Sequence, residues 1–150
     1  MRDINTRGYF GIGIENTKNI LNVGTLWRSA IIMGADYIFT IGKRYKHQSS
    51  DTMKAPKHIP LFEYENFDSF YASVPKGCRL VGIELDDRSV SSIDYKHPER
   101  CCYLLGAEDH GLTTRALSAC HDLVQLPGDF CLNVSTAGSI IMYDRLMKKT

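Results

Sequence analysis

Apolar residues gather in five short runs along the chain, and each run is bounded by polar or turn-forming residues. These runs predict buried β-strands at residues 7–14, 36–41, 79–85, 101–105 and 122–126. Short apolar runs between turn signals are typical of strands that lie in the core of a sheet.

Between the first two strands, apolar residues recur with the spacing of one helix face. The residues of this stripe are Val23, Leu26, Trp27, Ala30 and Ile31. Asn22 is the predicted N-cap and Gly34 the predicted C-terminal glycine of this helix. Helical patterns also fit residues 67–74, 113–119 and 133–148.

Strands that alternate with helices indicate an α/β fold with a mostly parallel sheet and helices on both faces. We expect a single domain over residues 1–150, because no repeat or linker interrupts the pattern. Ligands of such sheets bind beyond the carboxyl ends of the strands.

The composition, with 43% hydrophobic and 23% charged residues, excludes intrinsic disorder. No apolar run approaches the roughly 20 residues that span a bilayer, and the N-terminus lacks a secretory h-region. The five cysteines form no CxxC pair, and no His/Cys spacing suggests a metal site. A reduced, cytoplasmic location without membrane or metal partners is the expectation.

The net charge of +1 gives no global field, but basic residues are concentrated at one place. The segment from Lys43 to Lys57 holds five basic side chains, Lys43, Arg44 and Lys46 among them, against the acid Asp51. The segment is either a solvated surface loop or a surface that faces a polyanion.

Gly11 and Gly13 resemble the start of a dinucleotide fingerprint, but the third glycine is missing. Both glycines also lie inside an apolar run rather than in the turn that would hold a pyrophosphate. Close packing of strands is the better interpretation.

Three other segments carry candidate chemistry, and each also has a purely structural interpretation. Gly24 and Arg28 share a helix face. This favours either a ligand or another backbone that approaches closely beside the guanidinium, or an arginine that is simply solvated. Residues 106–112 form either a ligand loop at a strand's carboxyl end or a turn that Asp109 or Thr113 caps. The small residues of 131–139 favour either ligand approach or tight helix–sheet packing.

In combination and in this order, the three segments resemble the SpoU/TrmH family of RNA ribose 2′-O-methyltransferases, within the SPOUT superfamily. Three motifs match: N-x-G-x-x-x-R at Asn22, Gly24 and Arg28, G-x-E-x-x-G-L at Gly106, Glu108, Gly111 and Leu112, and L-N-V-S at residues 132–135. The resemblance covers residues 8–146, nearly the whole chain.

The resemblance implies an α/β domain with a C-terminal trefoil knot, a homodimer, and S-adenosylmethionine as the cofactor. Loops at 83–85, 106–111 and 126–132 would hold the cofactor. The implied cofactor-binding residues are Ile83, Glu84, Gly106, Glu108, Gly111, Leu126, Cys131, Leu132 and Ser135. Cys131 is a departure, since many relatives carry a serine there.

For catalysis, the resemblance implies roles for Arg28, Asn22, Glu108 and Asn133. An arginine is a costly base, so Arg28 is expected to stabilise the developing oxyanion and to hold a phosphate. Asn22 would orient Arg28 or the ribose, and Glu108 would hold Arg28 by a charge-assisted hydrogen bond.

The implied partner is RNA, with tRNA favoured over rRNA because the chain is similar to the single-domain members. Lys43, Arg44 and Lys46, together with Arg28, are the expected RNA-binding residues. Two alternatives stay open: a base nitrogen as the methyl acceptor, and a protein that binds RNA or cofactor without catalysis.

Overall fold

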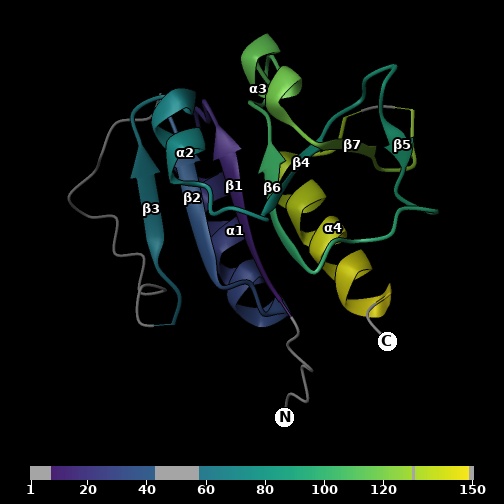
Figure 1. Ribbon diagram of the computed structural model, residues 1–150, viewed down its shortest axis with the longest axis horizontal. Coiled ribbons are helices and arrows are strands. Elements are labelled where there is room, and N and C mark those ends of the chain that lie inside the picture. Colours follow the sequence, from purple (N-terminus) through teal and green to yellow (C-terminus); the bar gives the residue numbers. More distant parts are fainter. Residues whose placement is uncertain (1–7, 43–57, 130, 149–150) are drawn as a thin grey trace.

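Seven parallel strands form one sheet in the computed structural model, which describes residues 8–42, 58–129 and 131–148. The strands are β1 (Tyr9–Glu15), β2 (Tyr37–Ile41), β3 (Leu61–Tyr64), β4 (Arg79–Ile83), β5 (Val90–Ser91), β6 (Arg100–Leu105) and β7 (Asp122–Gln125). Their order is β3-β2-β1-β6-β4-β7-β5, with β3 at one edge and β5 at the other (Figure 1).

Helices cover both faces of the sheet. The long helices α1 (Ile20–Met33) and α4 (Val134–Lys148) contribute to one core cluster, in which Ile12 and Ile14 of β1 are fully buried. The short helices α2 (Phe67–Ser73) and α3 (Thr114–Ala119) contribute to a second cluster with Leu80 and Leu104. The predicted α/β architecture is therefore confirmed.

All five predicted strands are present, with ends that differ by a few residues, whereas β3 and β5 were not predicted. Both missed strands lie at the edges of the sheet. Edge strands bury fewer side chains, so they need no continuous apolar run. In β3, Phe62 and Glu63 are exposed, and β5 has only two residues.

The predicted N-cap of α1 is wrong. Asn19 caps the helix instead, since its side chain accepts a hydrogen bond from the backbone N–H of Leu21 at 2.9 Å. The apolar stripe starts only at Val23, and this hid the first turn, where Leu21 is exposed to solvent. Asn22 lies within the first turn and is buried. Because Asn22 does not cap the helix, its side chain can form hydrogen bonds elsewhere. Gly34 ends the helix with a left-handed φ of 88°, as predicted.

Gly11 and Gly13 serve strand packing, as the sequence favoured. They pair with Tyr37 and Phe39 of β2, whose rings lie over the two glycines. A Cβ at Gly13 would stand 2.3 Å from the carbonyl oxygen of Phe39, and one at Gly11 would stand 2.3 Å from the Tyr37 ring. No side chain larger than hydrogen fits there.

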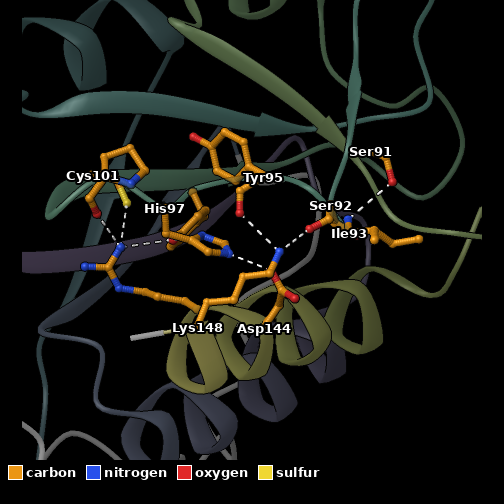
Figure 2. A network of polar contacts seen from close by, with 11 residues as sticks. Ser91, Ser92, Ile93, Tyr95, His97, Cys101, Asp144 and Lys148 are labelled. Atoms are coloured by element: carbon orange, nitrogen blue, oxygen red, sulfur yellow. Dashed lines mark hydrogen bonds and ion pairs between the residues drawn. The ribbon is translucent and has the colours of Figure 1, made fainter. Parts of the chain in front are cut away.

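The C-terminal half of α4 is anchored to the connection between β5 and β6. Arg145 is buried and donates to the carbonyl oxygens of Pro98 at 2.6 Å and Glu99 at 3.0 Å. Lys148 donates to the carbonyl oxygen of Tyr95 at 3.1 Å (Figure 2). The carbonyl oxygen of Glu99 also accepts from the N–H of Tyr9 in β1, so these bonds tie α4 to the start of the β1–β6 pair.

His97 lies at the centre of this network and contacts Tyr103 and Asp144. Its ring and Asp144 are labelled in Figure 2. Arg145 donates to the Tyr103 hydroxyl at 3.1 Å, and this hydroxyl lies 2.7 Å from His97 Nδ1. His97 Nε2 donates to Asp144 at 2.6 Å, since a carboxylate can only accept. Burial lowers the pKa of His97 despite the Asp144 carboxylate, which favours the neutral imidazole, whose Nδ1 then accepts from Tyr103.

We expect the free energy of unfolding to fall as the pH drops below 6.5, the ordinary pKa of histidine. The unfolded chain binds a proton there that the folded chain excludes, which limits the slope to about 1.4 kcal/mol per pH unit for one group. Urea unfolding at pH 5.5 and 7.5 measures this difference. The variant His97→Gln should lose it, and an unchanged slope in that variant would contradict the prediction.

Candidate functional site

A cavity of about 280 Å³ opens where three neighbouring strands end. Its walls follow the carboxyl ends of β4, β6 and β7 and include the start of α4. The lining residues are Ile83, Glu84, Leu85, Leu105, Gly106, Ala107, Glu108, Asp109, His110, Gly111, Leu126, Pro127, Cys131, Leu132, Val134 and Ala137. This is the edge at which parallel sheets bind ligands.

The loop after β6 forms one wall of the cavity and closes on itself. Ala107 and Gly111 exchange backbone hydrogen bonds of 3.1 and 2.9 Å. A Cβ on Gly106 would stand 2.3 Å from the carbonyl carbon of Gly111, and Gly111 has a left-handed φ of 67°. Both positions therefore require glycine.

Two carboxylates fix the far end of this loop. Glu84, after β4, accepts a hydrogen bond from the N–H of Leu112 at 2.7 Å. Glu15, at the end of β1 and buried, accepts from both the N–H and the hydroxyl of Thr113, at 2.8 and 2.9 Å. Thr113 is the N-cap of α3, one of the two alternatives that the sequence left open.

Glu108, in the middle of the loop, accepts hydrogen bonds from three donors. Thr17 Oγ1 and Asn22 Nδ2 donate to its Oε1, at 2.6 and 2.8 Å, and the N–H of Lys18 donates to Oε2 at 3.2 Å. Partial burial by itself would raise the pKa of Glu108, but these hydrogen bonds outweigh burial and lower it. Glu108 is therefore an ionised carboxylate at neutral pH.

Asn133 extends the network to the start of α4. Its Nδ2 donates to Asn22 Oδ1 at 3.2 Å, and its Oδ1 accepts from the N–H and hydroxyl of Ser135 at 3.0 and 2.6 Å. The contact with the N–H of Ser135 is that of a helix N-cap. One continuous chain of hydrogen bonds thus joins Glu108, Asn22 and Asn133 from the three motifs.

The cavity carries negative charge. Glu84, Glu108 and Asp109 line it, and among its lining residues none is a lysine or an arginine. Lys18 pairs with Asp109 at 2.8 Å, but Lys18 is not among the lining residues. Apolar walls with several carboxylates favour a ligand that has an apolar part and cationic or hydroxyl groups.

The predicted cofactor-binding residues all line the cavity except Ser135, which is buried and bonded to Asn133. Arg28 lies on α1 and is exposed. No contact between described residues joins Arg28 to Glu108, whose carboxylate binds Thr17, Lys18 and Asn22 instead. The expected pairing of these two charged residues is therefore absent. Lys43, Arg44 and Lys46 lie outside the described residues.

Several residues of the site were not predicted. Leu105, Val134 and Ala137 complete the wall of the cavity, and Glu15 and Thr17 hold its loop from behind. Glu15 and Thr17 had a signal in the sequence. They are polar residues at the carboxyl end of a predicted strand, where the site was expected.

Two further features of the described residues bear on the choice of ligands. They contain no group of three or more His, Cys, Asp or Glu side chains placed to hold a metal ion. They also contain no helix long and apolar enough to cross a bilayer. All five cysteines are free, and Cys101 and Cys102 are buried in β6 as packing residues.

Comparison with known proteins identifies the family. The sequence model of the SpoU rRNA Methylase family matches residues 10–143. A curated protein of Archaeoglobus fulgidus, described as an uncharacterized tRNA/rRNA methyltransferase, is 27% identical over 146 residues. The aligned part is 92% of this chain and 64% of that protein, so the chain spans less than two thirds of this relative's length.

Solved structures share the fold. The AdoMet-bound rRNA methyltransferase from Sinorhizobium meliloti has a TM-score of 0.82 at 22% identity, over 99% of this chain and 60% of that one. A structure described as giving insights into the 2-OH methylation of C/U34 on tRNA has a TM-score of 0.79 at 20% identity. That similarity covers 95% of this chain and 97% of the other chain.

Proposed function

The chain belongs to the SpoU rRNA methylase family, and we propose that it transfers a methyl group from S-adenosylmethionine to a ribose 2′-hydroxyl of RNA, most suitably tRNA. The observation that carries the proposal is the acidic cavity beside the Glu108–Asn22–Asn133 network. The proposal includes one domain over residues 1–150, a C-terminal trefoil knot and a cytoplasmic location.

The residues of the cavity fit S-adenosylmethionine by charge and shape. Ile83, Leu105, Leu126 and Leu132 offer apolar surface to an adenine, and Gly106 lines the same cavity. The cofactor's cationic ammonium and sulfonium groups suit a cavity that is lined by carboxylates and by no lysine or arginine. When bound, the cofactor supplies an activated methyl group.

Arg28 is the proposed catalytic residue. A ribose hydroxyl is a weak nucleophile, so negative charge on its oxygen has to be stabilised as the proton leaves. The guanidinium stays protonated and provides a planar pair of donors for that oxygen and for the adjacent phosphate. Its exposure on α1 leaves it accessible to an RNA backbone.

The contacts of Asn22, Glu108 and Asn133 suggest supporting roles rather than proton transfer. Asn22 is bonded on both sides, donating to Glu108 and accepting from Asn133. This fixes the first turn of α1 against two walls of the cavity. Arg28 follows on the same helix, so its backbone position relative to the cofactor is fixed as well.

The choice of tRNA is supported by a similarity of fold. The structure linked to methylation of C/U34 on tRNA resembles this chain over 95% of its residues, with a TM-score of 0.79. Ribosomal RNA is the second candidate, supported by the name of the Sinorhizobium meliloti rRNA methyltransferase and of the family. In either case Arg28, Lys43, Arg44 and Lys46 are the proposed RNA-binding residues.

We propose a homodimer that uses the outer surface of α1 and α4. Large apolar side chains are exposed on both helices: Leu21, Ile32, Ile140, Tyr143 and Met147. On α4 the spacing of Ile140, Tyr143 and Met147 places them on one stripe. A stripe of large, exposed apolar side chains is typical of a protein interface.

Methyl transfer from labelled S-adenosylmethionine tests the function. Undermodified bulk tRNA and rRNA are offered separately, then digested and analysed by nucleoside mass spectrometry. We expect a 2′-O-methylated nucleoside from the tRNA pool. A methylated base would contradict the proposed acceptor, a product from rRNA alone would contradict the proposed substrate, and cofactor binding without any product would favour a non-catalytic binder.

The variant Arg28→Lys should lose methyl transfer by about a hundredfold or more while it keeps cofactor affinity, because the charge remains but the planar pair of donors is lost. Initial rates and calorimetric titration with S-adenosylmethionine separate the two effects. Turnover like that of the unaltered protein would remove Arg28 from the mechanism.

The variant Tyr143→Asp should produce monomers, because it puts a charge into the proposed apolar interface. Sedimentation velocity over a range of protein concentrations measures the change. Tyr71→Asp is the matched control, since Tyr71 is a similarly exposed tyrosine on α2. A dimer that survives Tyr143→Asp, or an unaltered chain that is monomeric, would refute the proposed interface.

A further inference from the structure

The turn between β1 and α1, residues 16–19, lies outside the three motifs but contacts the loop of the second motif. We infer that Thr17 in this turn is a positioning residue for cofactor binding: its hydroxyl fixes the Glu108 carboxylate in the wall of the cavity. The inference rests on the proposed function, since it concerns affinity for S-adenosylmethionine.

Thr17 is fully buried, and its hydroxyl has one strong partner. Its Oγ1 lies 2.6 Å from Glu108 Oε1, whereas the carbonyl oxygen of Asn19 is 3.4 Å away. Because an ionised carboxylate can only accept, the hydroxyl proton points to Glu108. The N–H of Asn19 also points at Thr17 Oγ1, at 3.4 Å, which further favours this orientation of the hydroxyl.

Thr17 and Asn22 hold the same oxygen of Glu108, which restricts rotation of the carboxylate. The other oxygen, Oε2, accepts a longer bond of 3.2 Å from the N–H of Lys18. A carboxylate oxygen has room for a second donor. Since Glu108 lines the cavity, Oε2 keeps acceptor capacity for an ammonium or hydroxyl group of a bound ligand.

Two neighbouring contacts also join the segment around the turn to the loop after β6. On one side of Thr17, Glu15 holds Thr113, and on the other side Lys18 pairs with Asp109 at 2.8 Å. Lys18 and Asp109 are both accessible to solvent, so that ion pair contributes little. Two contacts of the turn act directly on Glu108, the longer bond from the N–H of Lys18 and the short, buried bond from Thr17, and Thr17 is the one that uses a side chain.

Removal of the Thr17 hydroxyl without loss of volume tests the inference. In Thr17→Val, the dissociation constant for S-adenosylmethionine should rise about tenfold or more, because a bond to a charged group is lost. In Thr17→Ser, which keeps the hydroxyl, it should stay within about threefold. Calorimetric titration of the full chain gives these constants, at a temperature where thermal unfolding shows every variant to be folded.

Thr40→Val is the matched control, because Thr40 is a buried threonine on β2 that does not line the cavity. It should leave the dissociation constant unchanged, whatever it does to stability. If Thr17→Val also binds the cofactor like the unaltered chain, Thr17 has only a structural role and the inference is wrong. If the unaltered chain does not bind S-adenosylmethionine, the proposed function fails, and the inference fails with it.

Discussion

The carboxylate of Glu108 needs hydrogen-bond donors, and this need determines how the site is assembled. A partly buried charge is costly unless it is hydrogen-bonded, so the loop after β6 is stable only where donors reach it. Thr17 and Lys18 in the turn after β1 and Asn22 in the first turn of α1 supply those donors. The side-chain oxygen of Asn22 in turn needs a hydrogen-bond donor, and Asn133 provides it from the start of α4. Three segments far apart in the sequence are therefore held together by the requirement of one ionised group.

Charge is distributed between the cavity and the helix in a way that suits methyl transfer to RNA. The carboxylates Glu84, Glu108 and Asp109 line the cavity, where a cationic cofactor is favoured. Arg28 is outside it and makes no ion pair with Glu108, so its charge is not neutralised by the cavity wall. Had Glu108 paired with Arg28, the pair would have used part of the acceptor capacity of the carboxylate and part of the donor set of the guanidinium. The absence of that expected pair therefore agrees with the proposed roles better than its presence would have.

Periodicity predicted the elements that bury many side chains, which are the five central strands and the helices. It missed β3 and β5 because edge strands place fewer residues in the core, and it put the cap of α1 at Asn22 because the apolar stripe starts at Val23. The motifs indicated which loops line the cavity, since these loops follow the carboxyl ends of parallel strands. They did not reveal Thr17 or Glu15, whose role depends on how the turn after β1 packs against a loop some ninety residues later. Contacts between distant segments have no periodic signal along the chain.

Contacts at the C-terminal end of α4 explain why its N-terminal end has a fixed position in the site. Arg145 is buried, and among the described residues it has no carboxylate partner. Its charge is satisfied by carbonyl oxygens and by the Phe10 ring, 4.8 Å from the guanidinium carbon. Such directional donors fix both the rotation and the axial position of a helix, which apolar packing alone does less strictly. Because a helix is stiff along its length, fixing α4 at Arg145 also fixes Asn133 at its start. The hydrogen bond from Asn133 to Asn22 then transmits that position to α1, and so to the backbone that carries Arg28.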